Sequence, residues 1–191
     1  MEAVEFSWVG ETARHVGTVV HAALQDYAQR PKLPSGAEIG AEQEHYRLRL
    51  ARHGVPRHEL EGAAERVVEA LTRSCEDERG RWILSGAHRE AASELALTGI
   101  AGGRLQSVII DRSFIDEHGS RWVIDFKTSS HTGGDREAFL QQQLERYRAQ
   151  LTSHSQLARA LGPEPVRAAL YLPLLGAFRE LALSEGVDDR E

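Results

Sequence analysis

The chain has 191 residues, of which 41% are hydrophobic and 27% charged, values that are ordinary for one soluble globular domain. No apolar run approaches the roughly 18 residues that a membrane span needs, and Met1 to Ser7 lack the basic start of a secretory signal. The net charge of −6 argues against a protein that coats nucleic acid but is compatible with a nucleic-acid enzyme. The single cysteine, Cys75, excludes disulfide frameworks and four-cysteine metal sites.

Helical periodicity dominates the first half of the chain. Apolar residues recur at helical spacing over 7–30, and a polar helix is expected over about 41–53. A further helix with one apolar stripe is expected from Pro56 to about 76–80. Residues 31–40 contain two prolines and two glycines, a composition typical of a loop. We therefore expect a helical N-terminal part over about 7–90.

The second half has the period-two alternation of β-strands. A glycine-containing turn at 116–120 predicts that the two strands beside it pair as a hairpin. The expected elements are strands over 93–98, 106–115, 121–127 and 166–172, with a helix from 136 to about 161. The order of elements predicts one α/β domain over 1–191, with a catalytic sheet and helix at about 91–183 and a polar tail at 184–191.

Two aspartates are expected to face one another across this hairpin. In the inferred register Asp111 lies opposite Asp125, and Lys127 shares the face of Asp125. The same register places Ile110 opposite Phe126 on the apolar face. Two carboxylates about 5 Å apart at Cβ repel one another unless a shared proton or a divalent cation neutralises them. Hard cations such as Mg²⁺ bind carboxylate oxygens, and a nearby lysine can stabilise negative charge on a phosphate.

From the hairpin alone, a solvated salt bridge is the simpler interpretation of an aspartate followed by Asp-x-Lys. The setting of Asp125 favours a functional role, because it ends the apolar run that starts at Val123. An unpaired carboxylate is costly in such a buried environment, and perturbed carboxylates are frequent at functional sites.

Residues 109–112 and 122–128 resemble the core of PD-(D/E)XK nucleases. More closely, they resemble the RecB/AddA-type nuclease domain at the C-terminal end of bacterial helicase–nucleases. The spacing Gly17-x-x-x-His21 is similar to the upstream histidine motif of that family, and the resemblance covers about 8–181. It implies an α/β fold with a restriction-endonuclease-like core, in which helices flank a small mixed β-sheet and a helical part precedes it.

The resemblance also implies a metal centre for Mg²⁺ or Mn²⁺. The implied catalytic residues are Asp111, Asp125 and Lys127. The implied metal ligands are His21, Asp111, Asp125 and the backbone carbonyl of Phe126. Glu94, on the preceding strand, is a candidate for an additional acidic residue. An imidazole ligand suits Mn²⁺ better than Mg²⁺. Without the resemblance, a lone histidine on an apolar helix face is more often a packed residue than a ligand.

The Gln-x-x-x-Tyr motif of the family has two candidates on the helix after the catalytic strand. Gln143 with Tyr147 matches the letters, whereas Gln150 with His154 fits the expected register but has histidine in place of tyrosine. The four positions lie on one helix stripe, for which core packing is the simpler alternative. We expect Gln150 to face the site, and all four residues are candidates for positioning DNA.

These features together imply a Mg²⁺- or Mn²⁺-dependent deoxyribonuclease of exonuclease type. The expected substrate is DNA, with a single-stranded end favoured. The expected role is the repair or recombination of DNA in a bacterial cytoplasm. The chain has no Walker-type ATP loop. The resemblance to helicase–nucleases implies two partners, a helicase motor in the same parent chain and a second subunit. Two alternatives stay open, a catalytically inactive DNA-binding scaffold and a structural metal site without hydrolysis.

Overall fold

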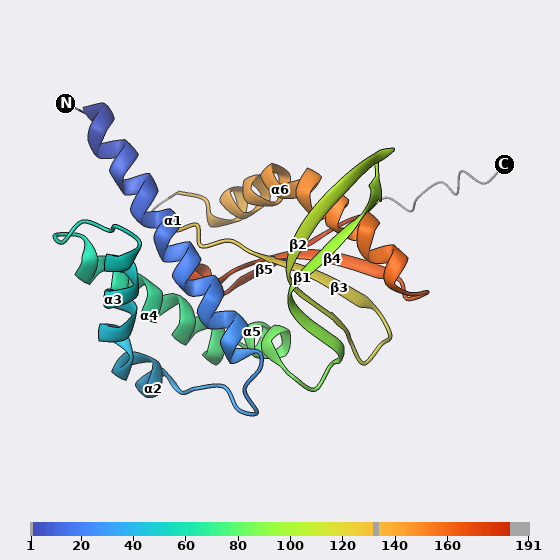
Figure 1. The fold of residues 1–191 in the computed structure, drawn as a ribbon, viewed down its shortest axis with the longest axis horizontal. Helices are drawn as coiled ribbons and strands as arrows, with labels where there is room; N and C mark the ends of the chain where they lie inside the picture. The colour runs from blue at the N-terminus through green and yellow to red at the C-terminus, as the bar shows by residue number, and fades with distance from the viewer. Residues whose placement is uncertain (1, 132–133, 184–191) are drawn as a thin grey trace.

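The computed structural model of the chain describes residues 2–131 and 134–183. The helices are α1 (Glu2–Tyr27), α2 (Gly36–Ala41), α3 (Gln43–Arg52), α4 (Leu60–Glu76), α5 (Glu78–Leu84) and α6 (Arg136–Ala158). The strands are β1 (Arg89–Ala101), β2 (Arg104–Ile115), β3 (Arg121–Phe126), β4 (Val166–Leu172) and β5 (Ala177–Leu181). Short 3₁₀ turns follow α6 and β4. Figure 1 shows the first five helices grouped beside the sheet, with α6 apart from them.

The five strands form one mixed sheet in the order β1-β2-β3-β4-β5. Only β3 and β4 run parallel, whereas the other neighbouring pairs are antiparallel. Parallel neighbours require a crossover connection, and α6 provides it. The expected α/β architecture, a small mixed sheet flanked by helices after a helical N-terminal part, is therefore confirmed.

Helices cover both faces of the sheet. The core beneath the N-terminal helices includes Val20, Leu24, Leu50, Leu71, Phe114, Ile124 and Phe126. The core beneath α6 includes Ile110, Val123, Leu144, Leu151, Leu170 and Leu172. The apolar stripe expected on the helix that starts near Pro56 is observed on α4, where Leu60, Val67 and Leu71 are buried. Strand β3, which carries Asp125, lies between the two cores and is buried along its whole length.

Two short helices differ from the sequence expectation. Residues 31–40 were expected to form a loop, but α2 occupies the end of this segment because Ser35 and Glu38 form a capping box. Helix α5 was also missed, and it begins at an N-cap in which the Asp77 side chain accepts the Gly80 N–H at 2.7 Å. Side-chain caps at Ser35 and Asp77 therefore allow helices to form where the glycines predicted a loop or a helix end.

The sheet is also larger than expected. Strand β1 is 13 residues long rather than the expected six, because it pairs with β2 up to a tight turn at Gly102 and Gly103, both at positive φ. Strand β5 was not predicted, and it follows a left-handed Gly176. The expected tail lies outside the described residues. No helix among the residues described is long and apolar enough to cross a membrane.

The expected hairpin register is confirmed near the turn and wrong farther out. The observed pairs are Arg112–Ile124, Ser113–Val123, Phe114–Trp122 and Ile115–Arg121. Beyond them β2 leaves β3, and Ile110 packs beneath α6 whereas Phe126 packs beneath the N-terminal helices. Asp111 is therefore not paired with Asp125. The Asp111 carboxylate instead accepts the backbone N–H of Phe126 at 2.7 Å, and this bond replaces the next rung of the ladder.

Candidate metal centre

Asp111 lies at the point where β2 separates from β3. Its Oδ2 accepts the N–H of Phe126, and its Oδ1 lies 3.7 Å from Nδ1 of His21. Burial and the nearby Asp125 carboxylate raise the pKa of Asp111 to about 7. In the absence of a cation, the site therefore holds a carboxyl group that is partly protonated near neutral pH.

Helix α1 brings His21 to this carboxylate. The ring of His21 packs edge-on against Phe126, with 5.8 Å between the ring centroids. One turn earlier, a Cβ on Gly17 would lie only 2.8 Å from Oγ1 of Thr128, so the glycine lets α1 approach the segment after β3. Burial lowers the pKa of His21, so the imidazole is neutral near pH 7, the form that binds metal ions.

We expect Gly17→Ala to destabilise the protein by about 1 kcal/mol or more, because the added methyl group overpacks the contact with Thr128. In an open helical position the same change stabilises, by about 0.5 to 1 kcal/mol. A Cβ added to Gly62 on α4 would meet no atom within 4 Å, so Gly62→Ala is the matched control. Urea unfolding measures both changes.

The background variant Thr128→Ala tests the cause of this expected loss. Removing the Thr128 hydroxyl and methyl groups should make Gly17→Ala neutral or stabilising. If Gly17→Ala stabilises the otherwise unchanged protein as Gly62→Ala does, then α1 does not approach Thr128 as closely as the structure shows.

Glu94 completes a cluster of donor atoms. One ligand atom each of His21, Glu94 and Asp111 lies within 4.8 Å of the others. Glu94 has φ of 51° and interrupts the β1–β2 ladder between Ser93 and Leu95. A non-glycine residue in this left-handed region costs roughly 1–3 kcal/mol and is frequent at functional sites. The cluster offers one nitrogen and several oxygens, a donor set that suits Mn²⁺ or Mg²⁺.

Asp125 is the penultimate residue of β3 and makes two polar contacts in a buried position. It is 1% exposed, its Oδ2 lies 2.6 Å from Nζ of Lys127, and its Oδ1 accepts the Gln150 amide at 2.8 Å. The Lys127 ammonium also lies 4.5 Å from the centroid of the Tyr147 ring, a cation–π distance. The lysine is thus held between a carboxylate and an aromatic face.

The sequence model of the PD-(D/E)XK nuclease superfamily matches residues 8–185. The chain belongs to the PD-(D/E)XK nuclease superfamily. The match covers most of α1, the whole sheet and α6, so it includes every element that contributes to the cluster around Asp111 and Asp125. A search of curated proteins finds no match. Members of this superfamily are in general metal-dependent nucleases that hydrolyse phosphodiester bonds, and the chain therefore carries a nuclease fold.

Within this PD-(D/E)XK domain, the four polar residues singled out on α6 all lie toward the sheet. Gln150 contacts Asp125 and Tyr147 contacts Lys127, as described above. Gln143 is buried and accepts a hydrogen bond from the Ser129 hydroxyl at 3.2 Å. His154 is buried, and among the described residues its Nδ1 has no hydrogen-bond partner. Burial lowers its pKa. Their role in positioning DNA stays a prediction.

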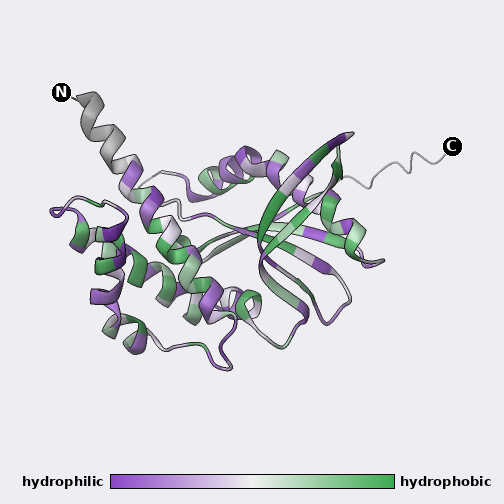
Figure 2. Cartoon of the chain, viewed as in Figure 1, coloured by the Kyte–Doolittle hydropathy of each residue, from purple (hydrophilic) through white to green (hydrophobic). Residues whose placement is uncertain are grey.

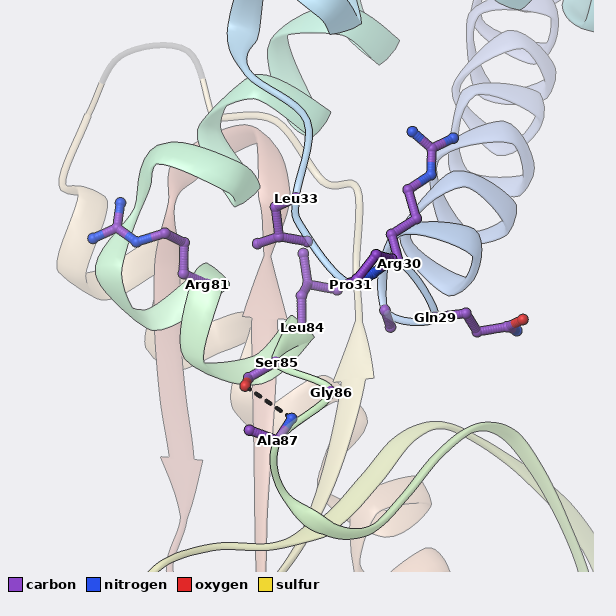
Figure 3. Close-up of a pocket in the computed structure, with 10 residues that line it drawn as sticks. Gln29, Arg30, Pro31, Leu33, Arg81, Leu84, Ser85, Gly86 and Ala87 are labelled. Carbon is purple, nitrogen blue, oxygen red and sulfur yellow. Dashed lines mark hydrogen bonds between the residues drawn. The ribbon is translucent and has the colours of Figure 1, made fainter.

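A pocket of about 550 Å³ opens beside the donor cluster of His21, Glu94 and Asp111. Its lining includes Arg14, Thr18, His21, Glu94, Lys127 and Thr128. A second pocket, of about 490 Å³, lies between the end of α1 and α5 (Figure 3). The second lining contains Arg30 and Arg81 but no imidazole or carboxylate, whereas the first contains two candidate metal ligands, His21 and Glu94.

The structure brings together the sequence-predicted His21 and Asp111, and it gives Glu94 more weight than the sequence did. The oxygens of Asp125 contact Lys127 and Gln150, and Asp125 is not part of the three-residue cluster. A signal for Glu94 was present, because counting back from the Gly102–Gly103 turn places it opposite Asp111.

Proposed function

We propose that this PD-(D/E)XK domain is a Mg²⁺- or Mn²⁺-dependent deoxyribonuclease whose cation is held by His21, Asp111 and Glu94. The observation that carries the proposal is the convergence of these three donors beside the Asp125–Lys127 pair. The carboxylate of Asp125 and the backbone carbonyl of Phe126 are further proposed ligands. A bound divalent cation would neutralise the carboxylates and lower the pKa of a coordinated water.

The protein residues have three proposed roles, which are metal binding, stabilisation of negative charge on a phosphate, and positioning of Asp125. His21 presents a neutral imidazole, and Asp111 would bind the cation as a carboxylate once its proton is released. Lys127, partly exposed at the pocket, places its ammonium where it can stabilise negative charge on a phosphate. Gln150 holds the Asp125 carboxylate in orientation from α6, as a positioning residue.

We further propose that the domain is the RecB/AddA-type nuclease module of a bacterial helicase–nuclease, acting as an exonuclease on DNA ends during cytoplasmic repair or recombination. The Gly17–His21 spacing supports this proposal, because Gly17 permits the approach that delivers His21. The net charge of −6 also supports it. An acidic nuclease gains from a tethered motor, or from a second subunit, that supplies DNA affinity and a high local concentration.

The test of nuclease activity is cleavage of linear single- and double-stranded DNA by the purified chain in Mg²⁺, Mn²⁺ or EDTA. We expect cleavage with either metal and none with EDTA. Asp125→Asn should abolish it, whereas Asp26→Asn should not, because Asp26 is exposed on α1 and forms an ion pair with Arg30.

Two results would contradict this proposal. Cleavage that survives EDTA or Asp125→Asn would place the activity elsewhere. DNA binding with no cleavage in either metal would favour the catalytically inactive scaffold instead.

A further inference from the structure

Lys127 follows the last residue of β3 and carries its ammonium on a flexible side chain. Its backbone is fixed, because the Lys127 N–H donates to the Tyr171 carbonyl on β4 at 3.0 Å. Its side chain is a four-carbon stem with rotatable bonds, so the fixed backbone does not by itself place the ammonium. The contacts of the side chain therefore decide where the positive charge lies in the candidate site.

Two contacts of different kinds hold this ammonium. Nζ of Lys127 lies 2.6 Å from Oδ2 of Asp125, which is an ion pair, and 4.5 Å from the centroid of the Tyr147 ring. The second contact is a cation–π interaction, in which the negative face of the ring attracts the cation. The ammonium is thus bridged between the end of β3 and helix α6.

Helix α6 supplies partners to both members of the Asp125–Lys127 pair. Tyr147 and Gln150 are three residues apart, so their side chains are neighbours on the surface of the helix. The Gln150 amide donates to Oδ1 of Asp125 at 2.8 Å, whereas the Tyr147 ring contacts Lys127. Figure 2 shows hydrophilic and hydrophobic residues interspersed along α6, as expected of a helix that presents polar groups to a partly buried site. One turn of α6 therefore contacts both side chains of the pair.

Tyr147 is set back from the open side of the site. Among the described residues, the lining of the pocket of about 550 Å³ beside the donor cluster includes Lys127 but not Tyr147. Tyr147 is half-buried and packs against the core beneath α6. A substrate in that pocket is therefore placed to contact the ammonium of Lys127 and not the ring that holds it.

A bound cation would change the balance between the two contacts. Asp125 is a proposed metal ligand, so its negative charge would be shared between the cation and the ammonium, and the ion pair with Lys127 would weaken. The Tyr147 ring stays available to Lys127, since the exposed Arg146 guanidinium lies farther from the ring centroid, at 5.5 Å. The ring is thus the contact that keeps the ammonium in place when Asp125 binds a cation.

We infer that Tyr147 is a positioning residue that holds the Lys127 ammonium through its ring face, and that its hydroxyl does not contact DNA. The inference rests on the proposed nuclease function, in which Lys127 stabilises negative charge on the phosphate. It replaces the role expected from the sequence, in which Tyr147 positions DNA. Removing the ring should therefore slow the chemical step without weakening the binding of DNA or of the metal.

The experiment is a double-mutant cycle of Tyr147→Leu and Lys127→Met, with Tyr147→Phe as the conservative variant. Leucine removes the ring, whereas phenylalanine keeps the ring and removes only the hydroxyl. Phe139→Leu is the matched control, because Phe139 is also half-buried on α6 and packs against the same core, but its ring stacks on His131. Single-turnover cleavage of a labelled linear oligonucleotide with Mn²⁺ gives the rate. Fluorescence anisotropy of the same oligonucleotide in EDTA gives the DNA affinity.

We expect Tyr147→Leu to lower the single-turnover rate about tenfold, since a partly desolvated cation–π contact is of that size. Tyr147→Phe and Phe139→Leu should cleave at rates close to that of wild type. In the Lys127→Met background Tyr147→Leu should lower the rate no further, because its effect passes through the lysine. The affinity for DNA, and for Mn²⁺ measured by calorimetry, should be unchanged in Tyr147→Leu.

A second cycle measures the same contact without any cleavage. Urea unfolding in EDTA of wild type, Tyr147→Leu, Lys127→Met and the double variant gives the coupling between the two side chains. We expect a coupling of about fivefold in the folding equilibrium constant, and Tyr147→Phe should retain it.

Two kinetic results would overturn the inference. If Tyr147→Phe loses as much rate as Tyr147→Leu, the hydroxyl is the functional group and the ring is not. If Tyr147→Leu slows cleavage equally in the wild-type and Lys127→Met backgrounds, Tyr147 acts independently of the lysine.

The unfolding cycle separates failure of this inference from failure of the proposed nuclease function. Zero coupling in EDTA would overturn the inference, because ring and ammonium would then not interact. If the wild type does not cleave DNA with either metal, the proposed nuclease function fails on its own, and the coupling still decides whether Tyr147 holds Lys127.

Discussion

Replacing Lys127 by methionine is expected to lower kcat for DNA cleavage by about 10² to 10³, the usual loss for one preorganised electrostatic contact. The ammonium lies between the Asp125 carboxylate and the Tyr147 ring, and methionine keeps most of its aliphatic length while removing the charge. Calorimetry with Mn²⁺ should show metal affinity close to that of wild type. Single-turnover kinetics measures the chemical step directly.

Two comparisons make the Lys127 result specific. Lys32→Met is the control, because Lys32 is the only other lysine and is exposed in the loop after α1. If Lys127 served only to keep Asp125 ionised, raising the pH would restore the rate of the methionine variant. A rate that stays low at all pH values supports a direct role at the phosphate, whereas full activity at neutral pH contradicts the site.

Asp111→Asn is expected to abolish metal binding and cleavage while stabilising the metal-free protein at pH 8 by about 1–3 kcal/mol. Burial beside Asp125 raises the pKa of Asp111 to about 7, whereas the unfolded carboxyl titrates near pH 4. Between these values the unfolded state releases a proton that the folded state keeps, so wild-type stability falls as pH rises from about 4 to about 7. The amide oxygen of asparagine still accepts the Phe126 N–H.

Urea unfolding in EDTA at pH 4, 6 and 8 measures this effect. The difference between variant and wild type should be small at pH 4 and grow up to about pH 7, then level off. Added Mn²⁺ should stabilise only the wild type. Parallel stability curves for the two proteins across this pH range would show that Asp111 carries no such burial penalty.

The sequence predicted four of the five strands, the crossover helix and the β2–β3 pairing near its turn, because each depends on local alternation or periodicity. It could not predict where β2 leaves β3. That point depends on the Asp111 carboxylate taking the Phe126 amide, a tertiary contact that pairing rules do not include. Short capped helices such as α2 were missed because a cap of two side chains is a weaker signal than two glycines.

For the candidate site, residue chemistry alone indicated Asp125 and Lys127, whose spacing places them on one face of a buried strand. His21 required the family resemblance, since nothing in the periodicity of α1 separates it from a packed histidine. The physical signal for it is Gly17, which is informative only once Thr128 is known to lie against it. Glu94 was underweighted because its left-handed backbone conformation is not visible in an alternating sequence.

His21 and Asp111 come from α1 and β2, elements that are far apart in the chain. A ligand shared by both side chains closes the long intervening loop, which contains most of the helical part. Closing such a loop removes chain entropy that the unfolded state would otherwise gain. Cation binding would therefore favour the docked position of α1, which the core beneath the N-terminal helices already holds. A chain that has not completed its fold therefore lacks the assembled donor cluster of His21, Glu94 and Asp111.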